Sequence, residues 1–195
     1  MNTAVNIITD AMARFGRLPA YLVYRAVYDN LGNHGRNRRV MRTSYTATNR
    51  ALTTLAEQGA VRLTHPDGTA ARVPDDRPRS RWPPVLADDV LVNAGEGCAE
   101  FDGFAYSTTT YAWKVLDDCG GAMSPQQIRE GIARLGGRTQ NASSVVRTLV
   151  DNHAAYSVVI GSRSYTWAMT TGDEDYCLTA DFVRGISRPF RTDDE

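Results

Sequence analysis

The strongest constraint on the fold is an order of local patterns that occurs twice along the chain. Three helical patterns are followed by two strand patterns, first over residues 5–73 and again over residues 111–169. In the helical patterns apolar residues recur three or four positions apart, and the strand patterns are short and separated by a turn sequence. The copies are offset by about 95 residues, which predicts an internal structural repeat.

The first copy predicts three helices and a strand pair. Its helical patterns cover residues 5–15, 19–31 and 44–58. Pro19 suits the first turn of the second helix, Ser44 is a candidate cap for the third, and Gly59 ends it. Residues 60–64 alternate like a strand, and residues 69–73 are expected to return as its partner after a Pro-Asp-Gly turn.

The second copy has its own start and stop signals. Its first helix covers residues 111–119 and ends at a Gly-Gly pair. A capping-box sequence at Ser124 opens the second helix, and either Thr139 or Asn141 caps the third. A hairpin is expected over residues 156–169, across a Gly-Ser turn.

The predicted domains follow from this repeat. A chain of 195 residues has room for one large domain or two small ones. Residues 74–84 read PDDRPRSRWPP, which is typical of an extended linker. Domains are therefore expected over residues 1–75 and 110–170, with a linker and irregular segment over residues 76–109 and an acidic tail over residues 171–195.

A neutral total hides opposite charges in the two halves of the chain. Residues 1–81 hold thirteen arginines against six acidic residues, a net charge of +7. Residues 82–195 hold nine basic against sixteen acidic residues, a net charge of −7. Five arginines with no acid among them fall within residues 36–50, and such a patch attracts polyanions. Mutual attraction of the halves, or a simply solvated arginine face, is the alternative explanation.

Composition narrows the function classes. Apolar residues make up 42% and charged residues 23% of the chain, as in soluble globular proteins. No apolar run reaches the roughly 20 residues that cross a bilayer, and no secretory signal is recognised. The three cysteines form no CxxC pair, and no histidine or acidic motif has metal or catalytic spacing. We therefore expect a cytoplasmic protein that is not an enzyme, with no cofactor, metal site or membrane contact.

The third helix and strand pair of each copy resemble the winged helix-turn-helix family, present as two units in tandem. The segments that carry the resemblance are TSYTATNRALTTLAEQGAVRLTHPDGTAARV, residues 43–73, and TQNASSVVRTLVDNHAAYSVVIGSRSYTWAM, residues 139–169. The first keeps the Gly-Ala-Val that precedes the wing in the family, whereas the second has His-Ala-Ala there. The resemblance implies a mainly α fold with small β-hairpins, of the α+β class.

For a winged helix that binds double-stranded DNA, the resemblance implies that the helix after Ser44 enters the major groove. The side chains expected to face the bases are Ser44, Tyr45, Thr46, Asn49 and Arg50. Arg50 suits the edge of guanine, and Asn49 suits that of adenine. The residues expected at the phosphate backbone are Arg36, Arg38, Arg39 and Arg42 before the helix, His65 in the wing, and Arg79 and Arg81 in the linker.

The leading hypothesis is a sequence-specific DNA-binding protein. It would be a transcriptional regulator or a replication or partition factor, of the kind that phages and plasmids carry, and would associate with the nucleoid. The acidic half is expected to self-associate or to contact a protein, with a second DNA contact as the alternative. Two other hypotheses stay open: an interaction subunit of a chromosome-organising complex, and an inhibitor that interferes with a host through its acidic half.

Overall fold

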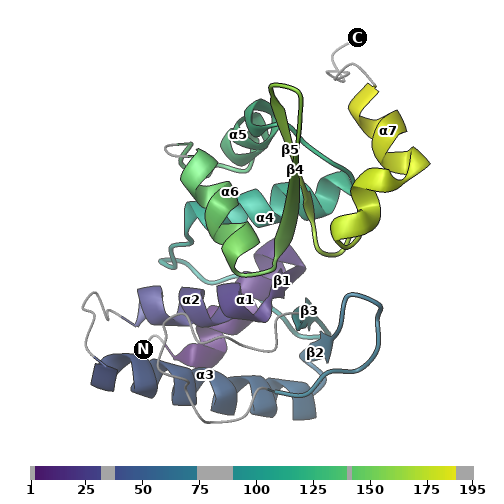
Figure 1. Ribbon diagram of the computed structural model, residues 1–195. Helices are drawn as coiled ribbons and strands as arrows, with labels where there is room; N and C mark the ends of the chain where they lie inside the picture. Colours follow the sequence, from purple (N-terminus) through teal and green to yellow (C-terminus); the bar gives the residue numbers. More distant parts are fainter. Residues whose placement is uncertain (1–2, 32–37, 74–89, 140–141, 188–195) are drawn as a thin grey trace. The chain divides into compact units, whose positions relative to one another are not determined.

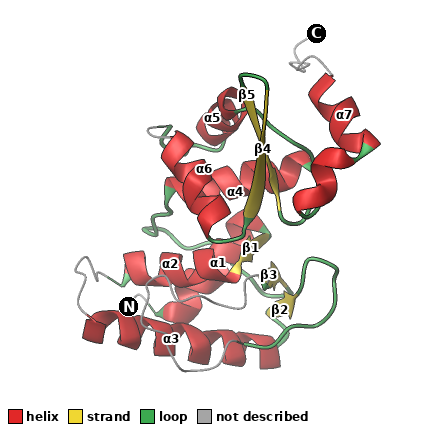
Figure 2. Ribbon diagram, in the orientation of Figure 1, coloured by secondary structure: helices red, strands yellow, loops and turns green. Residues whose placement is uncertain are grey.

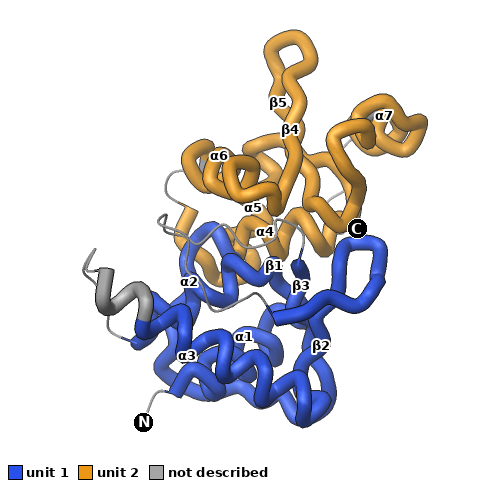
Figure 3. The backbone as a smooth tube through the Cα atoms, turned by 60° about the horizontal axis from the view of Figure 1, so that its bottom comes forward, with its two compact units in different colours: residues 1–110 blue, residues 111–195 orange. Residues whose placement is uncertain are grey.

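The computed structural model describes residues 3–31, 38–73, 90–139 and 142–187 (Figure 1). Over these residues the fold is mixed α+β, with seven α-helices, one 3-10 helix and two small antiparallel sheets (Figure 2). The chain divides into two compact units, residues 1–110 and residues 111–195 (Figure 3). Each unit has its own buried apolar core.

The first unit contains three helices and three strands. In chain order they are α1 (Ala4–Phe15), β1 (Arg17–Pro19), α2 (Ala20–Asn30), α3 (Arg38–Glu57), β2 (Val61–Thr64) and β3 (Leu91–Ala94). Thr3 caps α1 by accepting a hydrogen bond from the N–H of Asn6 at 3.2 Å, and Gly16 at φ 72° ends it. The apolar faces of the helices meet in a core in which Ile8 and Leu52 have no exposed surface.

Helix α3 begins at Arg38, well before the helix start that Ser44 predicts. Arginine and methionine have high helix propensity, and neither proline nor glycine stands between these two positions. Ser44 is therefore a buried residue inside the helix, and its carbonyl oxygen accepts a hydrogen bond from the Thr48 hydroxyl at 2.8 Å. The prediction of a cap at Ser44 is wrong, whereas the predicted stop at Gly59, which has φ 72°, is confirmed.

The strands of the first unit form an antiparallel sheet in the order β1-β3-β2. Leu18 of β1 and Leu63 of β2 both lie opposite Val92 of β3. The sequence pattern predicts the partner of β2 at residues 69–73; Ala70 does make an antiparallel bridge to Thr64, but these residues form no strand, and the strand that pairs with β2 is β3. Val92 is fully buried whereas positions 69 and 70 are exposed, so burial of an apolar strand decides the pairing.

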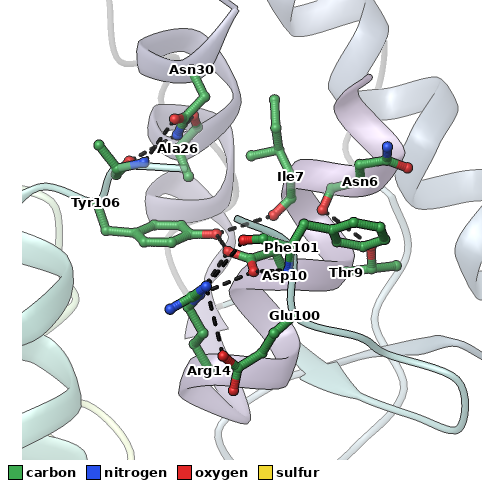
Figure 4. Close-up of polar contacts among 11 residues, drawn as sticks. Asn6, Ile7, Thr9, Asp10, Arg14, Ala26, Asn30, Glu100, Phe101 and Tyr106 are labelled. Carbon is green, nitrogen blue, oxygen red and sulfur yellow. Dashed lines mark hydrogen bonds and ion pairs between the residues drawn. The ribbon is translucent and has the colours of Figure 1, made fainter. Parts of the chain in front are cut away.

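A buried carboxylate of α1 holds residues 101–106 in place within the first unit (Figure 4). Asp10 of α1 has no exposed surface and accepts hydrogen bonds from the Phe101 N–H at 2.6 Å and from the Tyr106 hydroxyl. Nε of Arg14 lies 2.9 and 3.0 Å from the two oxygens of the same carboxylate. The hydrogen bond to Asp10 raises the pKa of Arg14. Both carboxylate oxygens are thus paired, as a buried charge requires.

A second link joins the same segment to α2. The amide of Asn30 donates to the carbonyl oxygen of Ala105 at 2.8 Å and accepts from its N–H at 2.9 Å. Together with β3, these contacts make residues 90–107 part of the first unit. The linker and irregular segment that the sequence predicts over residues 76–109 is therefore, where it is described, an ordered part of that unit.

The second unit contains most of α4 (Thr108–Cys119) and the elements that follow it. These are α5 (Pro125–Arg134), α6 (Ala142–Asp151), β4 (Ala155–Ile160), β5 (Arg163–Ala168), the 3-10 helix η1 (Glu174–Leu178) and α7 (Ala180–Ser187). The predicted capping box is confirmed, because Ser124 and Gln127 exchange side-chain to backbone hydrogen bonds at the start of α5. Trp113 of α4 is fully buried and donates from Nε1 to the carbonyl oxygen of Ala154 at 3.1 Å.

The two units share one order of elements. In the first, β1 follows the first helix and pairs with β3. In the second, Met123 follows α4 and pairs with Thr166 of β5 through hydrogen bonds of 2.8 and 2.9 Å. In the first unit β3 therefore lies between β1 and β2. In the second unit β5 lies in the same way between Met123 and β4.

Aromatic side chains of η1 and α7 pack on the β4–β5 hairpin and form a cluster with its rings. The rings involved belong to Tyr156, Tyr165, Trp167, Tyr176 and Phe182, with centroids between 5.5 and 6.2 Å apart. Trp167 also donates from Nε1 to the carbonyl oxygen of Asp173 at 3.1 Å. The sequence predicts a tail over residues 171–195, but residues 174–187 form η1 and α7, because Tyr176 and Phe182 supply apolar surface to bury.

Candidate nucleic-acid interface

The outward face of α3 is a row of threonines with one arginine. Thr43, Arg50 and Thr53 are exposed and Thr46 is half-buried. Their spacing of three, four and three residues places them on one side of the helix. Thr46 and Arg50, two of the residues predicted to face DNA bases, are thus on the outside of the unit.

Three arginines precede this row in the sequence of α3. Arg38, Arg39 and Arg42 lie in the first turns of α3, and positions 39 and 42 fall on the same row by helical spacing. The structure describes the backbone of these three residues and not their side chains. Three other predicted phosphate contacts, Arg36, Arg79 and Arg81, lie outside the described residues.

The segment from α3 to the turn after β2 has a net positive charge. Residues 38–72 hold six arginines against two acidic residues, a net charge of +4. Among them, Arg50, Arg62 and Arg72 are exposed, and no ion pair between the described residues involves these three side chains. Arg62 and Arg72 were not among the predicted contacts, although the alternation of residues 60–64 places Arg62 on the outward side of its strand.

Two acidic side chains elsewhere in the unit are already paired. Asp10 is bound by Arg14 at 2.9 Å, and Asp29 by Arg25 at 2.8 Å, both four residues apart on one helix. These carboxylates are therefore compensated locally. The positive charge of residues 38–72 is offset within that range by Glu57 and Asp67 alone.

Three residues predicted to contact DNA are turned into the protein. Ser44, Tyr45 and Asn49 are at most 5% exposed. The ring of Tyr45 stacks on Tyr24 of α2 with centroids 5.0 Å apart, and the side-chain oxygen of Asn49 accepts a hydrogen bond from the Tyr24 hydroxyl. They share the buried side of α3 with Leu52, so we leave them out of the candidate interface. The spacing of 45, 48, 52 and 55 carries this signal in the sequence.

The turn after β2 holds the last predicted contact, His65. Its N–H donates to the carbonyl oxygen of Thr69 at 2.8 Å, and its own carbonyl oxygen accepts from Gly68 at 2.9 Å. The hydroxyl and N–H of Thr69 both bind Asp67, which lowers the pKa of that carboxylate. The side chain of His65 is half-buried next to this fully charged acid, so the turn itself is a weaker anion site than α3.

The corresponding helix of the second unit has a different surface. The exposed side chains of α6 include Ser143, Ser144, Arg147 and Thr148. Arg147 lies 3.7 Å from Asp151 on the same helix, so its charge is partly offset. Acidic residues also gather at the start of η1, where Asp173 is the cap and Glu174 and Asp175 are the first two residues. Within α6 the charges of Arg147 and Asp151 cancel, whereas α3 holds four arginines against one acidic residue.

Other classes of site find little support in the described parts of the chain. Those parts contain no group of three or more histidine, cysteine, aspartate or glutamate side chains that could hold a metal ion. None of their helices combines the length and apolarity that crossing a membrane requires. Neither a model of any known protein family nor any curated protein matches this chain.

Proposed function

We propose that each unit is a winged helix-turn-helix domain and that the first binds double-stranded DNA through the outward face of α3. The order of helices and strands, repeated in both units, supports the fold assignment. In a winged helix the third helix enters the major groove and the connection between the last two strands forms the wing. Here α3 would be the reading helix, and the turn that begins at His65 would belong to the wing.

The observation that carries the proposal is the coincidence of charge and exposure on α3. Arg50 stands in the middle of an exposed row of hydroxyls, and positions 39 and 42 continue that row. Threonine hydroxyls bind phosphate oxygens or base edges, and arginine binds phosphate or the guanine edge. This surface fits a protein that acts by binding DNA, without covalent chemistry. Such a protein would be a transcriptional regulator, a replication factor or a partition factor.

The test is a binding titration of the full chain with a labelled duplex of about 30 base pairs at several salt concentrations. If about five phosphates are neutralised, the logarithm of the binding constant falls with the logarithm of salt concentration with a slope of about −4.5. Replacing Arg38, Arg39 and Arg42 by alanine should make this slope shallower by about 2.7, with the far-ultraviolet spectrum unchanged.

A matched control removes one arginine whose charge is already compensated. Arg25→Ala deletes the exposed partner of Asp29 on α2 and should leave the salt slope unchanged. Absence of binding at low salt, or equal effects of the control and the triple substitution, would reject the proposal. Selection of duplexes from a random pool then asks whether binding is specific for sequence.

A second candidate function is a protein-interaction subunit, and exposed apolar residues of the second unit favour it. Leu135, Val159 and Leu178 are all exposed, Leu178 by 79%. Where exposed apolar side chains form a contiguous patch, they mark contacts with protein or membrane. This alternative predicts a stable protein complex and no duplex binding at low salt, so the titration above separates the two.

A further inference from the structure

Strand β4 is an open sheet edge without the features that usually protect such edges. It is six residues long, and β5 is its only strand neighbour among the described residues. Residues 154–162 read AAYSVVIGS and contain neither a charge nor a proline. Proteins normally protect an edge strand with charges, proline, a bulge or a covering segment, because an unprotected edge pairs with another strand.

In the first unit both edge strands, β1 and β2, have features that protect them from pairing with another strand. Strand β1 has three residues and ends in Pro19, which has no N–H to offer. Strand β2 carries Arg62 and is covered along part of its outer side, where Ala71 donates to the carbonyl oxygen of Leu63 at 3.0 Å. Strand β4 carries neither a proline nor a charged residue.

The hydrogen-bond pattern of the hairpin shows which backbone groups of β4 face outward. The N–H of Met169 donates to the carbonyl oxygen of Ala154 at 3.0 Å, so this opposed pair is a hydrogen-bonded one. Hydrogen-bonded and non-hydrogen-bonded pairs alternate along an antiparallel ladder. Val158 lies four residues after Ala154 and opposite Tyr165, so this pair is also a hydrogen-bonded one, and the N–H and C=O of Val158 point toward β5. Ser157 and Val159 therefore direct their N–H and C=O groups away from β5.

We propose that β4 pairs with β4 of a second copy of this chain, antiparallel and centred on Val158. In that register Ser157 of one copy lies opposite Val159 of the other, so the outward N–H and C=O groups of both residues bond across the two-fold axis. On the opposite face the two Val158 side chains meet, and Ile160 lies beside Tyr156 of the second copy.

This partner fits the exposed surface of the hairpin better than a charged one does. Val159 is 71% and Ile160 45% exposed, and self-pairing would cover both with uncharged side chains. A strand without charges meets its own copy without repulsion between like charges. The pairing alone is smaller than a standard interface of about 800 Å² per partner, so we expect a reversible dimer with a dissociation constant of about 10–100 μM.

Disulfide trapping tests the register directly. In a full chain whose three native cysteines are replaced by serine, Val158→Cys places two sulfurs at the two-fold axis. Opposed Cα atoms of a non-hydrogen-bonded pair lie about 4.5 Å apart, within the range of disulfides. The matched control, Ile160→Cys, is more than about 12 Å from its own copy in this register. Mild oxidation should give at least about tenfold more cross-linked dimer for Val158→Cys on a non-reducing gel.

A charge pair at the same two positions gives an independent test by analytical ultracentrifugation. Ser157→Lys combined with Val159→Lys sets like charges opposite each other and should abolish the dimer. Ser157→Lys combined with Val159→Glu sets opposite charges together and should retain it. Val159→Pro removes an outward N–H without affecting the bonds to β5, and should weaken association at least about tenfold.

Three outcomes would overturn the proposal. They are a chain that stays monomeric up to several times the expected dissociation constant, equal cross-linking at positions 158 and 160, and dimerisation that appears only after residues 188–195 are deleted. The last would assign the edge to the chain's own C-terminal segment. All measurements are made without nucleic acid, so failure of the dimer leaves the DNA-binding proposal standing, and the reverse also holds.

Discussion

The two units share an order of elements but differ in what they present to the outside. In the first, the third helix α3 carries Arg50 and a row of threonines on its outward face, and 26 residues, 65–90, connect β2 to β3. In the second, α6 pairs its exposed arginine with Asp151, and the two-residue turn of Gly161 and Ser162 connects the strands. Apolar spacing therefore determines the shared order, whereas surface residues can differ without changing it.

The units also differ in how they complete their cores. The first uses a polar link, in which Asp10 binds residues 101 and 106. The second uses aromatic packing of η1 and α7 on the hairpin. A polar link specifies one geometry, and removing one partner lowers stability strongly because the other partner stays buried and unpaired. Aromatic packing stabilises the fold mainly through the apolar area that it buries. The following substitutions test this difference.

The largest effect is expected for Trp167→Ala in the second unit. Trp167 is 1% exposed and contacts three other rings, so its truncation should lower the free energy of unfolding by about 4 kcal/mol. Hydrogen exchange should accelerate in β4, β5 and α7 and stay unchanged in α1, α2 and α3. Equal acceleration in both units would contradict the separation of their cores.

Asp10→Ala should have the next largest effect, now in the first unit. It removes the acceptor of the Phe101 N–H and the Tyr106 hydroxyl and leaves Arg14, which is partly exposed, without its partner. We expect a loss of about 3 kcal/mol in chemical denaturation. Asp29→Ala, which deletes the acid of a more exposed pair, is the matched control and should cost at most about 0.5 kcal/mol.

Asn49→Ala should lower stability by about 1–2 kcal/mol, because it leaves the buried Tyr24 hydroxyl without this acceptor. Tyr24→Phe combined with Asn49→Ala should cost less than the sum of the single substitutions. The affinity of the folded protein for a duplex should not change. A selective loss of affinity would instead favour the base contact that the sequence suggests for Asn49.

The smallest expected effect on stability is that of Arg50→Ala, within about 0.5 kcal/mol, because the side chain is exposed. Its affinity for a duplex should fall about fivefold, whereas Arg147→Ala in the second unit should change it less than twofold. Fluorescence anisotropy at one salt concentration measures both. Equal losses would show that the positive face is not confined to the first unit.

Part of this structure could be predicted from local patterns. The stops at glycine, the capping box at Ser124 and the two-residue turn after Ile160 each depend on a few neighbouring residues. The start of α3 was missed because a serine that resembles a cap can equally stand inside a helix. The partner of β2 was missed because pairing across residues 65–90 depends on distant burial, which local alternation does not reveal.

The sequence by itself determined the order of the first six helices, the arginine content of the first half and the absence of charge along β4, because these are properties of composition and short-range spacing. Only the tertiary structure decided that Asn49 and Tyr45 face inward, that Asp10 is buried and paired, and that β5 is the one strand beside β4 among the described residues. Such features depend on which surfaces meet, and residues far apart in the chain settle that together.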